Sequence, residues 1–282
     1  MPAASPPNAA QIEHWNGQAG ETWVKLQERL DAQLAPLGRL VMDRAGIRPG
    51  EAILDTGCGT GQTTLELAER VGAAGQVTGL DISRPMLELA RQRGRSAGMG
   101  QLRFEEGDAQ TRAFAPASLD LVFSRFGVMF FADPVAAFAN LRAALRPGGR
   151  LGFVCWRPAR DNEWVAVPME AAFRHLPRPP APEPGAPGEF AFADRARVEG
   201  ILAGAGFADI QVEAADARIG GSSLDLAVDT TLRMGPVGAA LREEAPDKRP
   251  AVEAAVRAAL APFAGPDGVR MGAAMWLVSA KR

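Results

Sequence analysis

The sequence predicts an α/β fold: a doubly wound, mostly parallel seven-stranded sheet, preceded by helices and topped by a mainly helical cap built from inserted segments. Two observations carry this prediction. Short apolar runs alternate with helix-like patterns from residue 51 to 156, which is typical of parallel strands joined by crossover helices. A glycine-rich turn follows the first apolar run, at the edge where open α/β sheets bind ligands.

The composition favours a soluble globular protein. The chain has 282 residues, 47% of them hydrophobic and 23% charged, with a formal net charge of −2. It has no dense Lys/Arg run of the kind that binds nucleic acid and no apolar stretch of about 18 residues that would span a membrane. The two cysteines are far apart in the sequence, so we expect no metal centre, reduced thiols and a cytoplasmic location.

Residues 10–45 are predicted to be helical, because apolar residues recur there at helical spacing. Gly17 and Gly20 interrupt the first part of this stretch. Since glycine weakens a helix interior, two short helices are expected rather than one long helix.

The central region is expected to alternate strands with capped helices. Ser83 can cap one helix and Pro85 suits its first turn, while Asp133 caps a later helix. The buried face of that later helix is expected to consist of Val135, Phe138, Leu141 and Leu145. The expected strands of this region are 52–54, 76–80, 101–105, 119–124 and 150–156.

The pattern changes in the second half of the chain. A proline run at 177–182 predicts irregular structure, either a surface loop or part of a cover over a substrate. The elements expected after it are a helix over 194–205, a strand over 210–214, a mostly helical stretch over 222–263 and a last strand over 273–280.

The glycine-rich turn Asp55-Thr56-Gly57-Cys58-Gly59-Thr60-Gly61 does not match two common phosphate-binding loops. A P-loop requires Lys and then Ser or Thr after its last glycine, whereas Gln62 follows here. A dinucleotide fingerprint has the spacing G-x-G-x-x-G, whereas this turn has G-x-G-x-G. Binding of S-adenosylmethionine (SAM) remains, with a purely structural tight turn as the alternative.

Five motifs in order resemble those of the class I SAM-dependent methyltransferases, which have a Rossmann-like fold. They are Asp55-x-Gly57-x-Gly59-x-Gly61, Gly79-Leu80-Asp81, Gly107-Asp108-Ala109, Phe123-Ser124-Arg125-Phe126 and Arg146-Pro147-Gly148-Gly149. The chain is most similar to the small-molecule group that includes quinone-biosynthesis methyltransferases. The resemblance implies that Asp81 holds the ribose hydroxyls, that Asp108 contacts the adenine amino group and that Ser124 lies beside the methionine part of SAM.

The resemblance also implies a SAM-binding core with additions that cover the substrate. The expected segments are an N-terminal helical lid (1–45), the SAM-binding core (46–157), a proline-rich cover (158–192), a core helix and strand (193–216), a helical cap insertion (217–268) and a final core strand (269–282).

The candidate site residues follow from these motifs. The expected cofactor-binding residues are Trp15, Trp23, Asp55, Gly57, Gly59, Gly61, Asp81, Ile82, Met86, Asp108, Ala109 and Ser124. The expected substrate pocket consists of Phe126, Met129, Trp156 and Arg157. For Trp15 and Trp23, plain core packing is the alternative.

Two residues are candidates for catalysis. His14 is the candidate general base, because the lid would place it near the mouth of the site; an exposed helix residue is the alternative. Arg125 follows the fourth strand, where its guanidinium could hold a carboxylate or phosphate of the substrate or form an internal salt bridge.

The predicted function is transfer of a methyl group from SAM to O, N or C of a small organic molecule, with S-adenosylhomocysteine (SAH) as the product. One alternative is a SAM-binding protein without methyl transfer, acting as a sensor or in other SAM chemistry. Another is a protein or nucleic-acid methyltransferase, but the Asn/Asp-Pro-Pro-Tyr/Phe signature of amino-methylating DNA enzymes is missing after the fourth strand. The expected partner is therefore a small molecule, with no nucleic acid and no membrane span, and a homodimer is left open.

Overall fold

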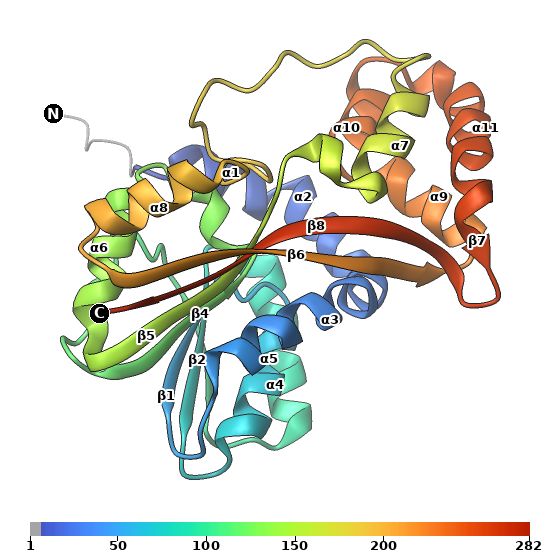
Figure 1. Cartoon of the computed structure of the whole chain (residues 1–282). Coiled ribbons are helices and arrows are strands. Elements are labelled where there is room, and N and C mark those ends of the chain that lie inside the picture. The colour runs from blue at the N-terminus through green and yellow to red at the C-terminus, as the bar shows by residue number, and fades with distance from the viewer. Residues whose placement is uncertain (1–6) are drawn as a thin grey trace, which may run out of the picture.

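A single sheet lies at the centre of the computed structural model, which describes residues 7–282 (Figure 1). Its strands are β1 (Ala52–Thr56), β2 (Gln76–Asp81), β3 (Leu102–Glu106), β4 (Leu119–Arg125), β5 (Leu145–Trp156), β6 (Ala208–Ser222), β7 (Ala264–Gly265) and β8 (Gly268–Lys281). The strand order is β3-β2-β1-β4-β5-β8-β6, and the short β7 pairs with β8. Strands β1 to β5 pair in parallel, whereas β8 is antiparallel to β5 and β6. The doubly wound, mostly parallel sheet is confirmed, and within the described residues the two-residue β7 is an eighth strand beyond the seven expected.

Helices cover both faces of this sheet and extend beyond one end of it. They are α1 (Ala9–Asn16), α2 (Gln18–Lys25), α3 (Gln27–Ala45), α4 (Gln62–Val71), α5 (Arg84–Ala97), α6 (Pro134–Ala144), α7 (Glu163–Ala172), α8 (Arg195–Gly204), α9 (Leu224–Arg233), α10 (Gly235–Glu243) and α11 (Arg249–Leu260). Helices α3, α4 and α5 lie on one face, and α6 and α8 lie on the other (Figure 1). None of these helices combines the length and hydropathy needed to cross a membrane, within the residues that the structure describes.

The N-terminal segment forms three helices rather than the two expected. Gly17 separates α1 from α2 as predicted, but Gly20 lies inside α2, and a further break at Leu26 separates α2 from α3. Ser83 stands at the cap position of α5 without capping it, because its hydroxyl donates instead to a backbone carbonyl in α1. This hydrogen bond ties the N-terminal helices to the core. Residues 1–6 of the expected lid lie outside the described residues.

In helix α6 the predicted N-terminal cap is confirmed, whereas the predicted buried face is confirmed only in part. Asp133 caps it as predicted, since its carboxylate accepts a hydrogen bond from the Ala136 amide at 3.0 Å. Phe138 and Leu141 are fully buried against the sheet, as expected. Val135 is exposed instead, because its side chain lies at the surface beside Gly204 of α8.

A second hydrophobic core lies in the cap, apart from the core of the sheet. Helices α7, α9, α10 and α11 gather around the outer ends of β6 and β8 (Figure 1). Its buried residues include Ala172, Phe173, Val228, Leu232, Val237, Leu241, Val252, Val256, Leu260, Val269 and Met271. The cap can therefore hold its own shape above the sheet.

Strands β6 and β8 carry the cap and are longer than predicted. The sequence indicated strands over 210–214 and 273–280, but the antiparallel pair continues outward past Ile219 and Met271, which face each other. Both side chains are buried under the cap. Packing against the cap helices thus extends the strands through residues whose glycine and polar content hides them in the sequence.

The segment predicted to be irregular contains a helix. The proline run at 177–182 has neither helix nor strand, as expected, but Glu163–Ala172 forms α7 with Pro168 inside it. Val165, Pro168 and Ala172 are buried. The proline run is not typical of the whole segment, because packing of α7 against α11 makes the first part regular.

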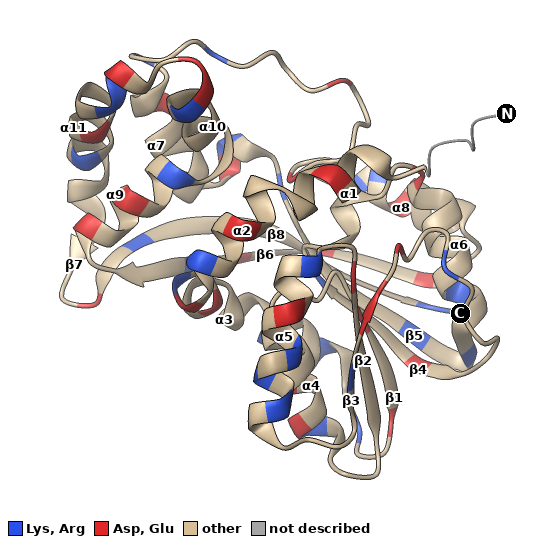
Figure 2. Cartoon of the chain, turned by 180° about the vertical axis from the view of Figure 1, so that it is seen from behind, with Lys and Arg blue, Asp and Glu red and all other residues tan. Residues whose placement is uncertain are grey.

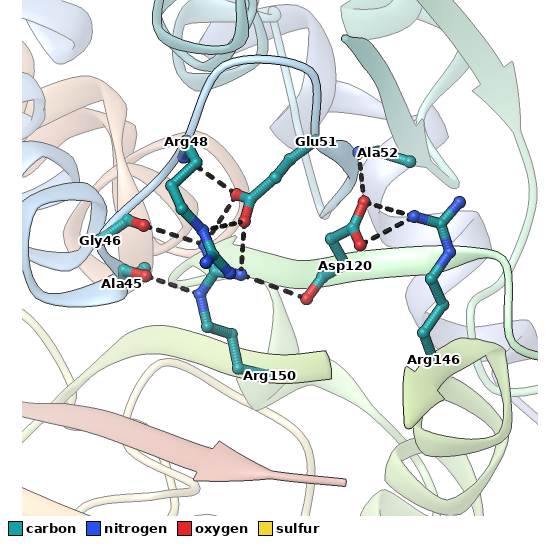
Figure 3. A network of polar contacts seen from close by, with 8 residues as sticks. All are labelled: Ala45, Gly46, Arg48, Glu51, Ala52, Asp120, Arg146 and Arg150. Atoms are coloured by element: carbon teal, nitrogen blue, oxygen red, sulfur yellow. Dashed lines mark hydrogen bonds and ion pairs between the residues drawn. The ribbon is translucent and has the colours of Figure 1, made fainter. Parts of the chain in front are cut away.

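An ionic network closes the amino end of the sheet (Figure 3). Glu51, which precedes β1, accepts a hydrogen bond from Arg150 of β5 at 2.8 Å. Asp120 of β4 accepts hydrogen bonds from the Ala52 amide and from Arg146, both at 2.8 Å. These contacts join β1, β4 and β5 at the end opposite to the glycine turn.

Candidate cofactor and substrate site

The glycine turn after β1 brings two backbone segments into contact. Gly57, Gly59 and Gly61 have φ values of 70°, 54° and 83°, which glycine adopts without a Cβ clash. A Cβ on Gly57 would lie 2.6 Å from the Cα of Gly127, in the turn after β4. The bare backbone of Gly57 and Gly59 therefore forms part of a cavity wall, whereas Gly61 begins α4 and packs away from the cavity.

Asp81 ends β2 at the same edge of the sheet. One of its carboxylate oxygens accepts a hydrogen bond from the Gly59 amide and the other from the Ser83 amide, each at 2.8 Å. The side chain lines the cavity although little of it is exposed, and this burial raises the pKa of its carboxyl group. Each oxygen keeps a further lone pair, so the carboxylate is oriented to accept two hydroxyl donors.

Asp108, which follows β3, has an unsatisfied oxygen. Its Oδ1 accepts hydrogen bonds from the Gln110 amide at 2.9 Å and from Asn8 at 3.3 Å. Its Oδ2 is buried and, within residues 7–282, has no hydrogen-bond partner. An unpaired buried acceptor is costly, and Asp108 lies in the cavity lining, so a donor placed there would offset the cost. The adenine amino group of SAM is such a donor, and Asp81, Gly57 and Gly59 line the same cavity, so these residues fit SAM.

Two residues expected to bind the cofactor support the turn instead. Asp55 lies beneath the turn and accepts hydrogen bonds from the hydroxyls of Thr63 and Thr64 at 2.6 and 2.7 Å. Complete burial raises the pKa of Asp55 to about 6. Ser124 donates to the carbonyl of Thr56 at 2.7 Å. Neither Asp55 nor Ser124 lines the cavity, because both side chains are used to hold the backbone around it.

The cavity has a volume of about 290 Å³ and lies between the glycine turn, the N-terminal helices and the cap. The expected residues that line it are Trp15, Trp23, Gly57, Gly59, Asp81, Ile82, Met86, Asp108, Ala109, Arg125, Phe126, Met129 and Trp156. The expected residues outside its lining are His14, Asp55, Gly61, Ser124 and Arg157.

Aromatic rings form two parts of the wall. Trp15 meets Trp23 edge to face at 5.9 Å between centroids and Phe130 at 5.3 Å. Phe126 stacks on Trp156 at 3.9 Å. Phe126 also has a φ of 63°, a conformation that costs a non-glycine residue about 1–3 kcal/mol and often occurs at functional sites. The two tryptophans of the lid are therefore both packed and open to the cavity.

Arg125 lines the cavity without an ion pair among the described residues. Its guanidinium donates a hydrogen bond to the Gln62 side chain, and burial lowers its pKa. The nearby carboxylate of Asp31 pairs with Arg93 at 2.9 Å instead. The internal salt bridge that sequence reasoning left open is not formed, so the positive charge of Arg125 is available to an anionic group in the cavity.

His14 and Arg157 do not face the cavity. His14 is exposed on α1, where its ring meets Trp15 edge to face at 5.2 Å and partial burial lowers its pKa. Arg157 pairs with Asp216 at 2.8 Å and lies over the Trp276 ring. Side-chain alternation explains this result: the Arg157 amide continues the pairing with β8 just past the end of β5, and neighbouring residues of an extended chain point to opposite faces, so Arg157 points away from the cavity that Trp156 lines. The structure gives no support for His14 as a base or for Arg157 as a pocket residue.

Sequence reasoning missed the share of the lining that the N-terminus, the cap and the proline-rich segment contribute. These residues include Asn8, Arg29, Leu30, Leu34, Trp164, Met169, Glu189, Ile219, Thr230, Thr231, Met234, Leu260 and Met271. The apolar residues of α7 recur at helical spacing, which was the one signal for that part of the wall. Glu189 carried no signal, because nothing local to the loop shows which way it turns.

Comparisons with known proteins agree with this geometry. A family model described as a methyltransferase domain matches residues 53–149. The aklanonic acid methyltransferase of Streptomyces sp. (strain C5) is 35% identical over 154 residues, which are 52% of this chain and 70% of that protein. The demethylmenaquinone methyltransferase of Staphylococcus aureus (strain MRSA252) is 38% identical over 133 residues, or 47% of this chain and 54% of that protein. The match thus spans more than two thirds of one relative and about half of the other.

Solved structures share the fold. Phosphoethanolamine N-methyltransferase 2 of Haemonchus contortus, solved with phosphomonomethylethanolamine and SAH, superimposes with a TM-score of 0.61 at 17% identity, covering 100% of this chain and 61% of that one. At that identity the likeness shows the fold alone. Together, the motifs, the cavity at the carboxyl end of the sheet and the sequence relatives show that this chain is a SAM-dependent enzyme and belongs to the class I methyltransferases.

Proposed function

We propose that this methyltransferase modifies O, N or C of a small, largely apolar organic molecule. One observation carries the proposal: the cavity that begins at the glycine turn continues beneath the cap, where its walls are mainly apolar. The apolar wall includes Leu30, Leu34, Met129, Trp164, Met169, Leu260 and Met271. An apolar cavity with a few polar groups is typical of small-molecule sites. The names of the two relatives, which refer to aklanonic acid and demethylmenaquinone, support a ring-containing acceptor.

The proposed cofactor contacts follow from the unsatisfied polar groups. SAM supplies a methyl group on a positively charged sulfur. Asp81 would accept hydrogen bonds from the ribose hydroxyls, and Asp108 would accept one from the adenine amino group. Trp15 and Trp23 would cover the cofactor, where aromatic faces attract a sulfonium by cation–π interaction. Arg125 would hold an anionic group of the cofactor or the acceptor.

The covering segments would align the acceptor and exclude water. Arg29 of α3 pairs with Asp229 of α9 at 2.8 Å, so the N-terminal lid and the cap touch across the cavity. We propose that the lid (1–45), the proline-rich cover (158–192) and the cap insertion (217–268) together close over both substrates. Methyl transfer requires mainly alignment and a dry site, which these covers supply.

Charge distribution supports a small-molecule partner over nucleic acid. Residues of both signs lie on α9, α10 and α11 around the cap (Figure 2), rather than one basic face that would follow a phosphate backbone. The absence of a nucleic-acid partner, the cytoplasmic location and the homodimer stay predictions.

SAM binding and turnover test the proposal directly. We expect purified protein to release SAH when incubated with SAM and a member of a panel of hydroxynaphthoquinones, phenols, amines and hydroxy acids. Asp81→Asn should weaken SAM binding by about 1–3 kcal/mol, because one carboxylate oxygen that binds an amide and a ribose hydroxyl becomes an NH₂ group. Asp120→Asn, at the opposite end of the sheet, should leave SAM affinity unchanged.

The outcomes separate the alternatives. SAM binding without SAH release from any acceptor would favour a SAM-binding protein that has no transfer activity. Faster methylation of RNA, DNA or a protein mixture than of every small molecule would contradict the proposed acceptor class.

A further inference from the structure

Five charged side chains line the cavity, and their partners differ. They are Arg29, Asp81, Asp108, Arg125 and Glu189. Each of the first four has a hydrogen bond or an ion pair, as described above. Within residues 7–282 no such contact reaches the carboxyl group of Glu189. Its acceptor oxygens are therefore available to whatever occupies the cavity.

The loop around Glu189 is fixed to the core on both sides. The Gly188 amide donates to the carbonyl of Met129, in the turn after β4, at 3.1 Å. Arg197 of α8 donates to the carbonyl of Ala191 at 3.1 Å. Because these contacts hold the flanking backbone, the carboxyl is presented to the cavity by a fixed support rather than by a free loop.

Glu189 lines the cavity and is an exposed residue, although many protein atoms lie near its carboxyl group. This surrounding raises the pKa of the carboxyl above its ordinary value. A base whose pKa lies closer to neutral accepts a proton more effectively at neutral pH. The other titratable groups in the lining are Arg29, Cys58, Asp81, Asp108 and Arg125. Burial raises the pKa of the Cys58 thiol far above neutral, so it does not compete as a base.

We infer that Glu189 is the general base of the reaction and takes the proton from an O–H or N–H group of the acceptor. This inference rests on the proposed function. The acceptor atom forms a bond to the methyl carbon as the carbon–sulfur bond breaks, and sulfur keeps that electron pair. The O–H or N–H bond breaks, its electrons stay on the acceptor, and the proton passes to Glu189. The carboxyl then returns the proton to water. An acidic hydroxyl, as in a phenol or a hydroxyquinone, is the acceptor class that this step fits best.

Turnover of Glu189→Gln tests the step. With the acceptor that gives the fastest SAH release from the wild type, kcat should fall about 100-fold or more while SAM affinity stays within about twofold. Glu189→Asp should keep part of the activity, since it retains the carboxylate. Glu183→Gln makes the same charge change in the same segment outside the cavity lining, and should behave as the wild type. The rise of kcat with pH in the wild type should be absent from Glu189→Gln.

A kcat within about threefold of the wild type in Glu189→Gln, or a change confined to KM, would overturn the assignment. A second measurement does not depend on finding the acceptor. In an NMR titration of SAH-loaded protein carrying ¹³C-labelled glutamate, the Glu189 carboxyl signal is identified by its absence from Glu189→Gln. Its pKa should lie above the ordinary glutamate range. Titration at or below that range would contradict the inference. If the wild type releases no SAH with any acceptor, the proposed function fails, and this titration still decides whether Glu189 is a free, elevated carboxyl.

Discussion

The two ends of the same sheet use acidic residues in opposite ways. At the amino end, Glu51 and Asp120 each accept a hydrogen bond from an arginine side chain (Figure 3). At the carboxyl end, Asp81 is held by two backbone amides, and Asp108 keeps one oxygen without a partner in the described chain. Charged guanidinium groups therefore satisfy Glu51 and Asp120. Asp81 and Asp108 are held in place by neutral donors and keep acceptor capacity for a ligand.

The pKa directions follow this difference. Burial alone would raise the pKa of Glu51, but hydrogen bonds from Arg150 and from the Arg48 amide outweigh it and lower the pKa. Burial raises the pKa of Asp55 and Asp81, because amides and hydroxyls offset it only in part. The amino end therefore contributes stability, whereas at the carboxyl end Asp81 keeps a raised pKa and acceptor lone pairs that face the cavity.

Of the substitutions considered, Gly57→Ala should have the largest effect, because it disturbs the glycine turn at the carboxyl end of the sheet. The new Cβ would need a positive φ, costing about 1–2 kcal/mol, and would overlap the backbone of Gly127, costing about 1–3 kcal/mol more. We expect the free energy of unfolding to fall by about 2–5 kcal/mol and SAM affinity to fall about 100-fold or more, as measured by denaturation and calorimetry.

Gly98→Ala is the matched control, because Gly98 has a φ of 64° but nothing within 4 Å of the added Cβ. It should show the cost of φ alone, about 1–2 kcal/mol, with unchanged SAM affinity. Equal effects of the two substitutions would show that the Gly57–Gly127 contact is unimportant.

Arg150→Ala should destabilise the amino end of the sheet and leave the cofactor site unchanged. Removing the guanidinium leaves the buried carboxylate of Glu51 poorly compensated, so we expect a loss of about 2–4 kcal/mol in unfolding free energy and no change in SAM binding. Arg146→Ala removes a more exposed partner and should cost less than about 1 kcal/mol.

The loss caused by Arg150→Ala should depend on pH. The folded-state pKa of Glu51 lies below 4.5, so its ion pair stabilises the protein above that pH and stops doing so as pH falls through the lowered pKa. A difference from the wild type that grows as the pH falls below 4.5 would contradict this account.

Asp55→Asn should raise the free energy of unfolding by a smaller amount, and the gain should depend on pH. One oxygen of Asp55 accepts both threonine hydroxyls and the other has no partner in residues 7–282, so an asparagine can keep both hydrogen bonds. The folded pKa of about 6 lies above the ordinary 3.8, so the wild type loses stability as pH rises from about 4 to about 6. Above pH 6 the variant should be more stable than the wild type by about 1–3 kcal/mol. Parallel stability curves between pH 4 and pH 7 would rule out a raised pKa.

The contrast between the turn and the cap shows what could be predicted from sequence. Gly57, Gly59, Asp81 and Asp108 line the cavity as predicted, because their positions depend on spacing within a few residues of a strand end. Arg157 was misplaced because the side of β5 on which each residue faces depends on the register of the strand. His14 was misplaced because the orientation of α1 depends on packing between helices.

Local periodicity predicts the sheet and its crossover helices, and the spacing of the turn glycines, which adopt positive φ, predicts the cofactor. Which residues line the cavity beneath the cap depends instead on contacts between distant parts of the chain. The long pair β6–β8 brings the cap helices over the glycine turn, and the loop anchored at Met129 turns Glu189 into the same cavity. These contacts join residues 47 to 73 positions apart, and no local pattern encodes such distances.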